Sequence, residues 1–171
     1  MTEQNKAEPI DPQLFRRVLG HFAAGVTVVT TVDAHGIPRG MTATAFSSVS
    51  LDPPLVLVCV EKRAFFSEAI SAASHFCVNF LAAHQEHLSQ RFASREQDKF
   101  AGLEQRQSSH GVPLLTETLG FVECAQHEIF AGGDHLIVVG RIVQLEVTGG
   151  EPLIHFAGKY RFLQGLDSAI T

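Results

Sequence analysis

Two long strand-like runs joined by a glycine turn constrain the fold of this chain more than any other feature. Residues 119–130 and 135–147 are both long enough for extended strands and contain many β-branched and aromatic residues. The sequence Ala-Gly-Gly-Asp at 131–134 lies between them, and glycine accepts the backbone angles that a tight hairpin needs. The sequence therefore predicts a long antiparallel hairpin.

The rest of the chain adds short strands and helices that do not alternate regularly. Four further runs have strand character: 25–33, 55–60, 76–81 and 152–163. Three stretches have apolar residues at helical spacing: 12–22, 64–74 and 84–95. A polar loop is expected over roughly 96–111. This pattern favours a mainly β fold, a closed or nearly closed antiparallel barrel with peripheral helices.

Length and composition indicate one globular domain. The chain has 171 residues, of which 45% are hydrophobic and 18% charged, a balance typical of a folded protein. We expect a mobile tail at 1–11, a domain over 12–163 and a second tail at 164–171. The net charge of −5 argues against nucleic-acid binding, which depends on clustered basic residues.

The apolar runs are too short for a membrane span. The longest covers about 55–60, and the N-terminal residues lack the apolar stretch of a secretory signal. We therefore expect no membrane contact and a cytoplasmic location. Cys59, Cys77 and Cys124 lie in apolar segments with no CxxC spacing, which favours buried reduced thiols over a disulfide or metal site.

Small and hydroxyl-bearing residues dominate the stretch 38–54. The backbone there would be accessible, and Thr42, Thr44, Ser47 and Ser48 could offer hydroxyls to a flat polar ligand. A polar edge strand stabilised by threonines explains the same residues, so the two interpretations stay open.

Several histidines are candidates for chemistry. His135 follows Asp134 at the start of a predicted strand, where its imidazole could meet a ligand; a half-exposed strand residue after a turn is the alternative. His84 and His87 could share a helical face, but no third metal ligand has readable spacing, so we predict no metal site. Phosphate-binding and hydrolase motifs are missing, so any difficult chemistry would belong to a bound cofactor.

Several segments together carry a family resemblance that spans roughly residues 12–163. They are FRRVLGHFAAGVTVVTT, GMTATAFSSVSLDPPLVLVCV, FCVNFL, RFASREQDKF, GGDHLIVVGRIV and HFAGKYRFL. This set closely resembles the flavin reductase components of two-component flavin-dependent monooxygenases, with SLDPPLVL and GDH the most specific parts.

The resemblance implies a split β-barrel homodimer with flavin near the subunit interface. Such a protein would reduce FMN or FAD with NADH or NADPH and release the reduced flavin to a partner monooxygenase. It also implies that His135 docks the nicotinamide. The flavin would contact the following residues: Pro38, Arg39, Gly40, Met41, Thr42, Thr44, Ala45, Cys59, Val60, Glu61, Lys62, Phe66, Ala93, Asp98, Lys99 and Tyr160.

One departure from the family pattern affects the expected flavin contacts. Ala64 and Phe66 stand where relatives usually carry serine or threonine bonded to the flavin tail. The change removes two hydroxyl contacts, each worth on the order of 1 kcal/mol, unless Phe66 stacks on the flavin or an adenine. A flavin-storage or sensor protein, or a barrel without flavin, therefore stays as an alternative.

Overall fold

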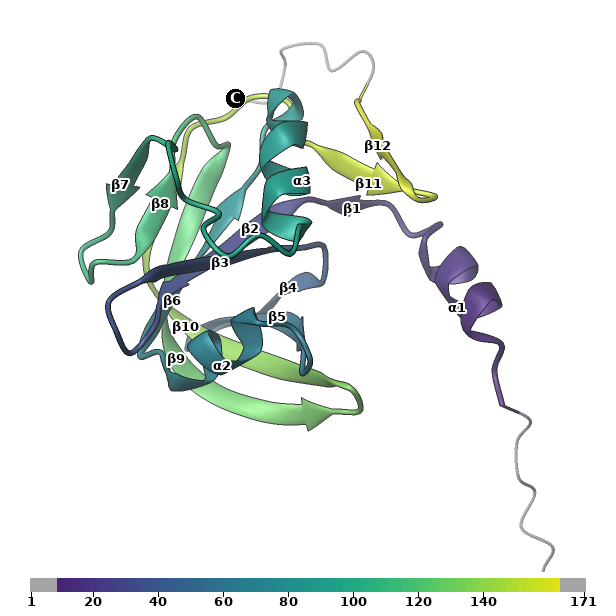
Figure 1. The fold of residues 1–171 in the computed structure, drawn as a ribbon, viewed down its shortest axis with the longest axis horizontal. Helices are drawn as coiled ribbons and strands as arrows, with labels where there is room; N and C mark the ends of the chain where they lie inside the picture. The colour runs from purple at the N-terminus through teal and green to yellow at the C-terminus, as the bar shows by residue number, and fades with distance from the viewer. Residues whose placement is uncertain (1–8, 164–171) are drawn as a thin grey trace, which may run out of the picture.

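The computed structural model describes residues 9–163; of the two predicted tails, residues 1–8 and 164–171 lie outside this range. Its main sheet contains seven antiparallel strands in the spatial order β3-β2-β6-β9-β10-β5-β4 (Figure 1). β3 contacts β5 although the two are not neighbours in the sheet, so the sheet curls toward closure. The strands are β2 (Thr27–Val32), β3 (Pro38–Ala43), β4 (Phe46–Leu51), β5 (Pro54–Glu61), β6 (His75–Phe80), β9 (Gly120–Gly132) and β10 (His135–Val147).

The predicted long hairpin is confirmed as β9 and β10. The two strands pair from the His135–Gly132 pair at the turn to the Val147–Gly120 pair at the far end. Gly133 in the turn has a φ of 65°, which a residue without a Cβ adopts at little cost. The mainly β, antiparallel class expected from this hairpin is confirmed as well.

β2 separates two hydrophobic clusters and is buried on both faces. Its threonine hydroxyls are buried without loss of hydrogen bonding: Thr27 donates to the Ala43 carbonyl at 2.7 Å, Thr30 to Pro113 at 2.6 Å and Thr31 to His75 at 2.7 Å. Because buried hydroxyls are costly only when unpaired, a Thr-rich strand fits a core position here.

The prediction of one strand over 152–163 is wrong. The segment forms a small hairpin of β11 (Ile154–Phe156) and β12 (Lys159–Arg161), and β11 also pairs with β1 (Ala24–Gly25). Ala157 and Gly158, between the two strands, have φ values of 50° and 75°, so the chain reverses its direction there. The sequence indicates this turn only weakly.

Two other segments contain more strand than expected. The stretch 37–50 forms both β3 and most of β4. The predicted loop 96–111 includes β7 (Gln105–Gln107), which pairs with β8 (Pro113–Leu115).

The predicted helices are present but shorter. They are α1 (Pro12–Leu19), α2 (Phe66–Ala72) and α3 (Glu86–Ala93), with a 3-10 turn at Ala83–Gln85 before α3. α3 contacts β3 and β2, and α2 contacts β2, β3 and β5. α1 is capped by Asp11 and stands away from the barrel, with no buried residue (Figure 1). Within residues 9–163, no helix has the length and apolar character required to cross a membrane.

Candidate functional site

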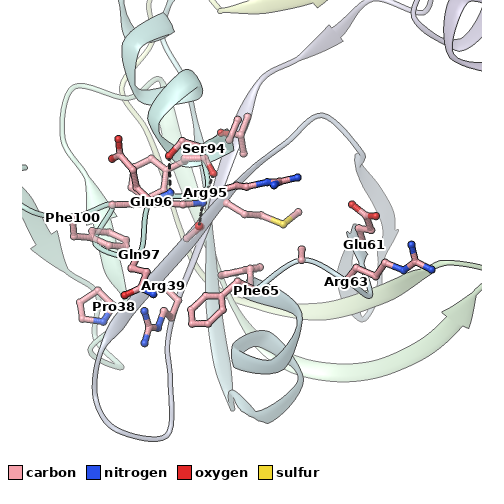
Figure 2. A pocket seen from close by; sticks show the side chains of 18 residues that line it. Pro38, Arg39, Glu61, Arg63, Phe65, Ser94, Arg95, Glu96, Gln97 and Phe100 are labelled. Atoms are coloured by element: carbon pink, nitrogen blue, oxygen red, sulfur yellow. Dashed lines mark hydrogen bonds between the residues drawn. The ribbon is translucent and has the colours of Figure 1, made fainter.

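A pocket of about 800 Å³ lies beside β3 (Figure 2). Three segments form it: β3 itself, the turn that leads from β5 into α2, and the stretch that follows α3. Its lining residues are Pro38, Arg39, Gly40, Met41, Thr42, Glu61, Arg63, Ala64, Phe65, Phe66, Phe92, Ala93, Ser94, Arg95, Glu96, Gln97, Lys99 and Phe100. The size lies within the range of pockets that hold small molecules.

A glycine permits the packing under the pocket. The rings of Phe92 and Phe100 meet edge to face, with centroids 5.0 Å apart, beneath Gly40. A Cβ on Gly40 would lie 2.7 Å from a ring carbon of Phe92, closer than carbon atoms approach in proteins. Gly40 therefore brings the backbone of β3 close to both rings.

The pocket carries an excess of positive charge although the whole chain is acidic. Arg39, Arg63, Arg95 and Lys99 line it, against the carboxylates of Glu61 and Glu96. Arg39 is already paired with Asp33 at 2.8 Å, whereas Arg63 and Arg95 form no salt bridge within the described residues. The two free guanidinium groups suit a phosphate-bearing ligand.

Lys99 connects two walls of the pocket. Its Nζ donates to the Phe92 carbonyl at 2.7 Å and to the Gly40 carbonyl at 3.4 Å. Burial lowers the pKa of Lys99 below its ordinary value, while the carboxylate of Glu96 acts in the opposite direction. Lys99 thus holds the end of α3 against β3.

Thr42 and Tyr160 belong to one hydrogen-bonded chain behind the pocket. The Thr42 hydroxyl donates to the Ser89 carbonyl at 2.6 Å, and the Ser89 hydroxyl lies 2.8 Å from that of Tyr160. The hydroxyl of Thr42 is therefore engaged by α3, and Tyr160 supports the pocket without lining it.

His135 lies at the edge of the site, one strand away from the pocket lining. It is paired in register with Glu61 of β5, a lining residue. Its Nδ1 lies 2.7 Å from Asp134 Oδ1, and the hydrogen bond from His135 lowers the pKa of Asp134. Its side chain is 43% exposed, so one face of the imidazole is open to a ligand.

The structure brings nine of the predicted site residues into the pocket lining and leaves eight outside it. Lining it are Pro38, Arg39, Gly40, Met41, Thr42, Glu61, Phe66, Ala93 and Lys99. Outside it are Thr44, Ala45, Cys59, Val60, Lys62, Asp98, His135 and Tyr160.

The residues outside the lining have identifiable positions. Val60 is a fully buried core residue, and Lys62 donates to the Gly133 carbonyl at 2.6 Å across the hairpin turn. Asp98 lines a smaller neighbouring hollow together with Pro38 and Arg39. The roles given to these residues from sequence stay predictions.

Sequence reasoning did not single out Arg63, Phe65 or Arg95 as lining residues. Arg63 and Arg95 lie close in sequence to residues expected to contact the flavin, so their charge was a usable signal. The sequence contained no signal for Phe65, because the orientation of a side chain in a turn depends on the packing of the following helix.

Comparisons with known proteins relate the chain to flavin reductases. A family model described as "Flavin reductase like domain" matches residues 19–164. The reductase subunit HsaB of a flavin-dependent monooxygenase from Rhodococcus jostii is 43% identical over 155 residues, 90% of this chain and 79% of HsaB. An NADH-dependent flavin reductase from a Rhodococcus species is 40% identical over 172 residues, which cover 96% of this chain and 94% of that protein.

A solved structure supports the same relationship. The NADH:FAD oxidoreductase of Streptomyces globisporus, in complex with NAD and FAD fragments, superposes with a TM-score of 0.85 at 38% identity. The match covers 94% of this chain and all of that one, and the predicted split-barrel fold is thereby confirmed. A family match over most of the sequence, together with this fold, shows that the chain belongs to the flavin reductase-like family.

Proposed function

We propose that this protein uses NADH or NADPH to reduce FMN or FAD and passes the reduced flavin to a partner monooxygenase. The observation that carries the proposal is the cationic pocket beside β3, in a chain that belongs to the flavin reductase-like family. The relatives named above are a reductase subunit, a flavin reductase and a flavin oxidoreductase. They lend no support to the alternative of a flavin-storage or sensor protein.

The residues of the pocket fit a flavin nucleotide. β3 presents its backbone along one wall, where a planar ring system can lie against main-chain groups, and Arg63 and Arg95 supply charge for phosphate. Ala64 lines the pocket but offers no hydroxyl, and Phe66 is only 4% exposed, within the core cluster. Flavin affinity then rests on the backbone and the arginines more than on side-chain hydroxyls.

The protein's part in the reaction is to hold two rings in contact. A flavin bound here would accept a hydride at N5 from C4 of the nicotinamide, which requires a separation of about 3–3.5 Å. We expect His135, which is hydrogen-bonded to Asp134 and paired with Glu61, to contact the hydride donor. No side chain needs to transfer a proton for this step, so positioning accounts for most of the rate.

The test is oxidation of NADH and of NADPH by the purified protein with FMN and FAD in turn, followed by absorbance. Oxidation well above the flavin-only background is expected with at least one flavin, and tight flavin binding without oxidation would refute the proposal. Arg63→Gln and Arg95→Gln should each raise the Kd for FMN by roughly tenfold, the value of a charge-assisted hydrogen bond. Arg141→Gln, an exposed change outside the pocket, is the matched control and should leave this Kd as it is.

We also propose that the protein is a homodimer. α1 exposes five large apolar residues in or just after it, each between 44% and 79% exposed: Leu14, Phe15, Val18, Leu19 and Phe22. A row of exposed apolar residues on a helix that has no buried residue is typical of a subunit interface. Light scattering should give twice the 18.6 kDa chain mass, and Phe15→Glu should shift it toward one chain. A wild-type protein that is monomeric at micromolar concentration would refute dimerisation.

A cytoplasmic location stays a prediction.

A further inference from the structure

Phe65 is a large aromatic residue that stands exposed at the mouth of the pocket. It is 68% exposed, although it follows directly on lining residues and precedes the buried Phe66. Exposed aromatic rings are unfavourable in water, and one at a pocket rim is typical of a contact surface for a ligand. The reaction proposed above gives Phe65 no role, because neither the isoalloxazine wall on β3 nor the nicotinamide contact involves it.

The ring of Phe65 is fixed on one side and open on the other. The guanidinium of Arg39 lies over it, with Cζ 4.9 Å from the ring centroid (Figure 2). Arg39 is itself held by Asp33, whose carboxylate also accepts the backbone N–H groups of His35 and Ile37 at 2.9 and 3.0 Å. This series of contacts orients the ring before any ligand arrives, so little side-chain freedom is lost on binding.

The charged residues near Phe65 indicate which kind of ligand ring would stack on it. Arg39, Arg63 and Arg95 line the same pocket as Phe65 (Figure 2). A ligand that carries a flat heterocycle joined to phosphate matches an aromatic surface flanked by guanidinium groups. Among the flavins and nicotinamide cofactors of the proposed reaction, the adenosine diphosphate half of a dinucleotide has this chemistry.

We propose that Phe65, backed by Arg39, is the stacking platform for the adenine ring of a dinucleotide. The inference rests on the proposed function and extends it, because it names the side chain that recognises adenine; if the adenine is that of FAD, the protein discriminates FAD from FMN. FMN ends at its single phosphate and has no adenine ring to stack on Phe65. FAD therefore gains a contact that FMN lacks. The nicotinamide dinucleotide carries the same adenosine diphosphate group and is the other source of this ring.

The test compares the two flavins by fluorescence titration of the wild type and of Phe65→Ala. Base–aromatic stacking measured by alanine substitution predicts that the ratio of FAD to FMN affinity falls by about 5- to 150-fold. Phe65→Tyr retains the aromatic face and should restore the ratio, whereas Phe65→Leu retains an apolar side chain and should not. Phe130→Ala removes another exposed phenylalanine, on β9 away from the pocket, and should leave the ratio at its wild-type value.

A second arm separates the two sources of adenine. The KM for NADH is measured with FMN as the acceptor, so that NADH is the only dinucleotide present. A raised KM in Phe65→Ala with an unchanged flavin ratio would assign the platform to the hydride donor; a changed ratio with an unchanged KM would assign it to FAD. If neither quantity changes, or if the Tyr and Leu variants behave alike, the platform is refuted. Failure of the proposed function is distinguishable, since the wild type would then fail to oxidise both NADH and NADPH with either flavin.

Discussion

Gly40→Ala tests whether close packing between β3 and two phenylalanine rings shapes the pocket. The added Cβ would lie 2.7 and 2.8 Å from two ring carbons of Phe92 and 3.4 Å from Phe100, whereas carbon atoms pack best at about 3.5–4.0 Å. Phe92 is a fully buried residue of α3 and belongs to a hydrophobic core cluster, so its ring has little room to move away. One of the two elements must shift.

The expected cost follows from overpacked cores in general, about 1–3 kcal/mol of unfolding free energy. For a chain of this size each kcal/mol lowers the melting temperature by roughly 2–4 °C, so Gly40→Ala should melt about 2–12 °C below the wild type. The FMN affinity should fall too, because Gly40 lines the pocket and its carbonyl accepts a hydrogen bond from Lys99.

The assay is thermal unfolding at one fixed protein concentration, with and without FMN. Gly25→Ala is the matched control: no atom lies within 4 Å of its added Cβ. This variant should be as stable as the wild type or gain about 0.4–1 kcal/mol, because alanine restricts the unfolded chain. If Gly40→Ala melts within one degree of the wild type and binds FMN equally well, the tight contact with Phe92 does not constrain the pocket and the reasoning fails.

Three further predictions address other parts of the molecule. Burial alone would raise the pKa of the Glu123 carboxyl, but hydrogen bonds from a serine, a histidine and a second serine lower it below its ordinary value. The ionised Glu123 therefore stabilises the fold above the ordinary glutamate pKa, and this stabilisation is lost as the pH falls through the lower pKa of the folded state. When the free energy of unfolding is measured against pH in acid, it should fall less steeply for Glu123→Gln than for the wild type. An identical slope for the two proteins would contradict this. His135→Ala should raise the KM for NADH several-fold and leave the Kd for FMN within twofold, so unchanged steady-state kinetics would count against a donor contact. A thiol reagent should modify the half-buried Cys59 first, since burial raises the pKa of Cys124 to about 12 and that of Cys77 further; equal rates for all three would show that the barrel opens readily.

The sequence alone predicted the mainly β, antiparallel class and the long hairpin. The Gly-Gly turn between two long runs predicts the hairpin of β9 and β10, because the local backbone requirement and the strand propensities agree there. The family motifs carry the function, and nine of the predicted site residues do line one pocket. The hairpin at Ala157 was missed because alanine rarely adopts a positive φ and gives no turn signal.

Only the tertiary structure decided which side chains face the pocket. Phe65 and Phe66 are adjacent and chemically identical, yet one is exposed at the pocket mouth and the other is buried in the core, because the start of α2 turns one ring inward. Thr42 and Tyr160 are predicted ligand contacts, and only the structure shows that their hydroxyls bond to the carbonyl and the hydroxyl of Ser89 on α3. Composition and spacing predicted the longest strands, since those depend mostly on near neighbours. The direction of each side chain at the site depends on contacts between segments far apart in the sequence, which no local pattern contains.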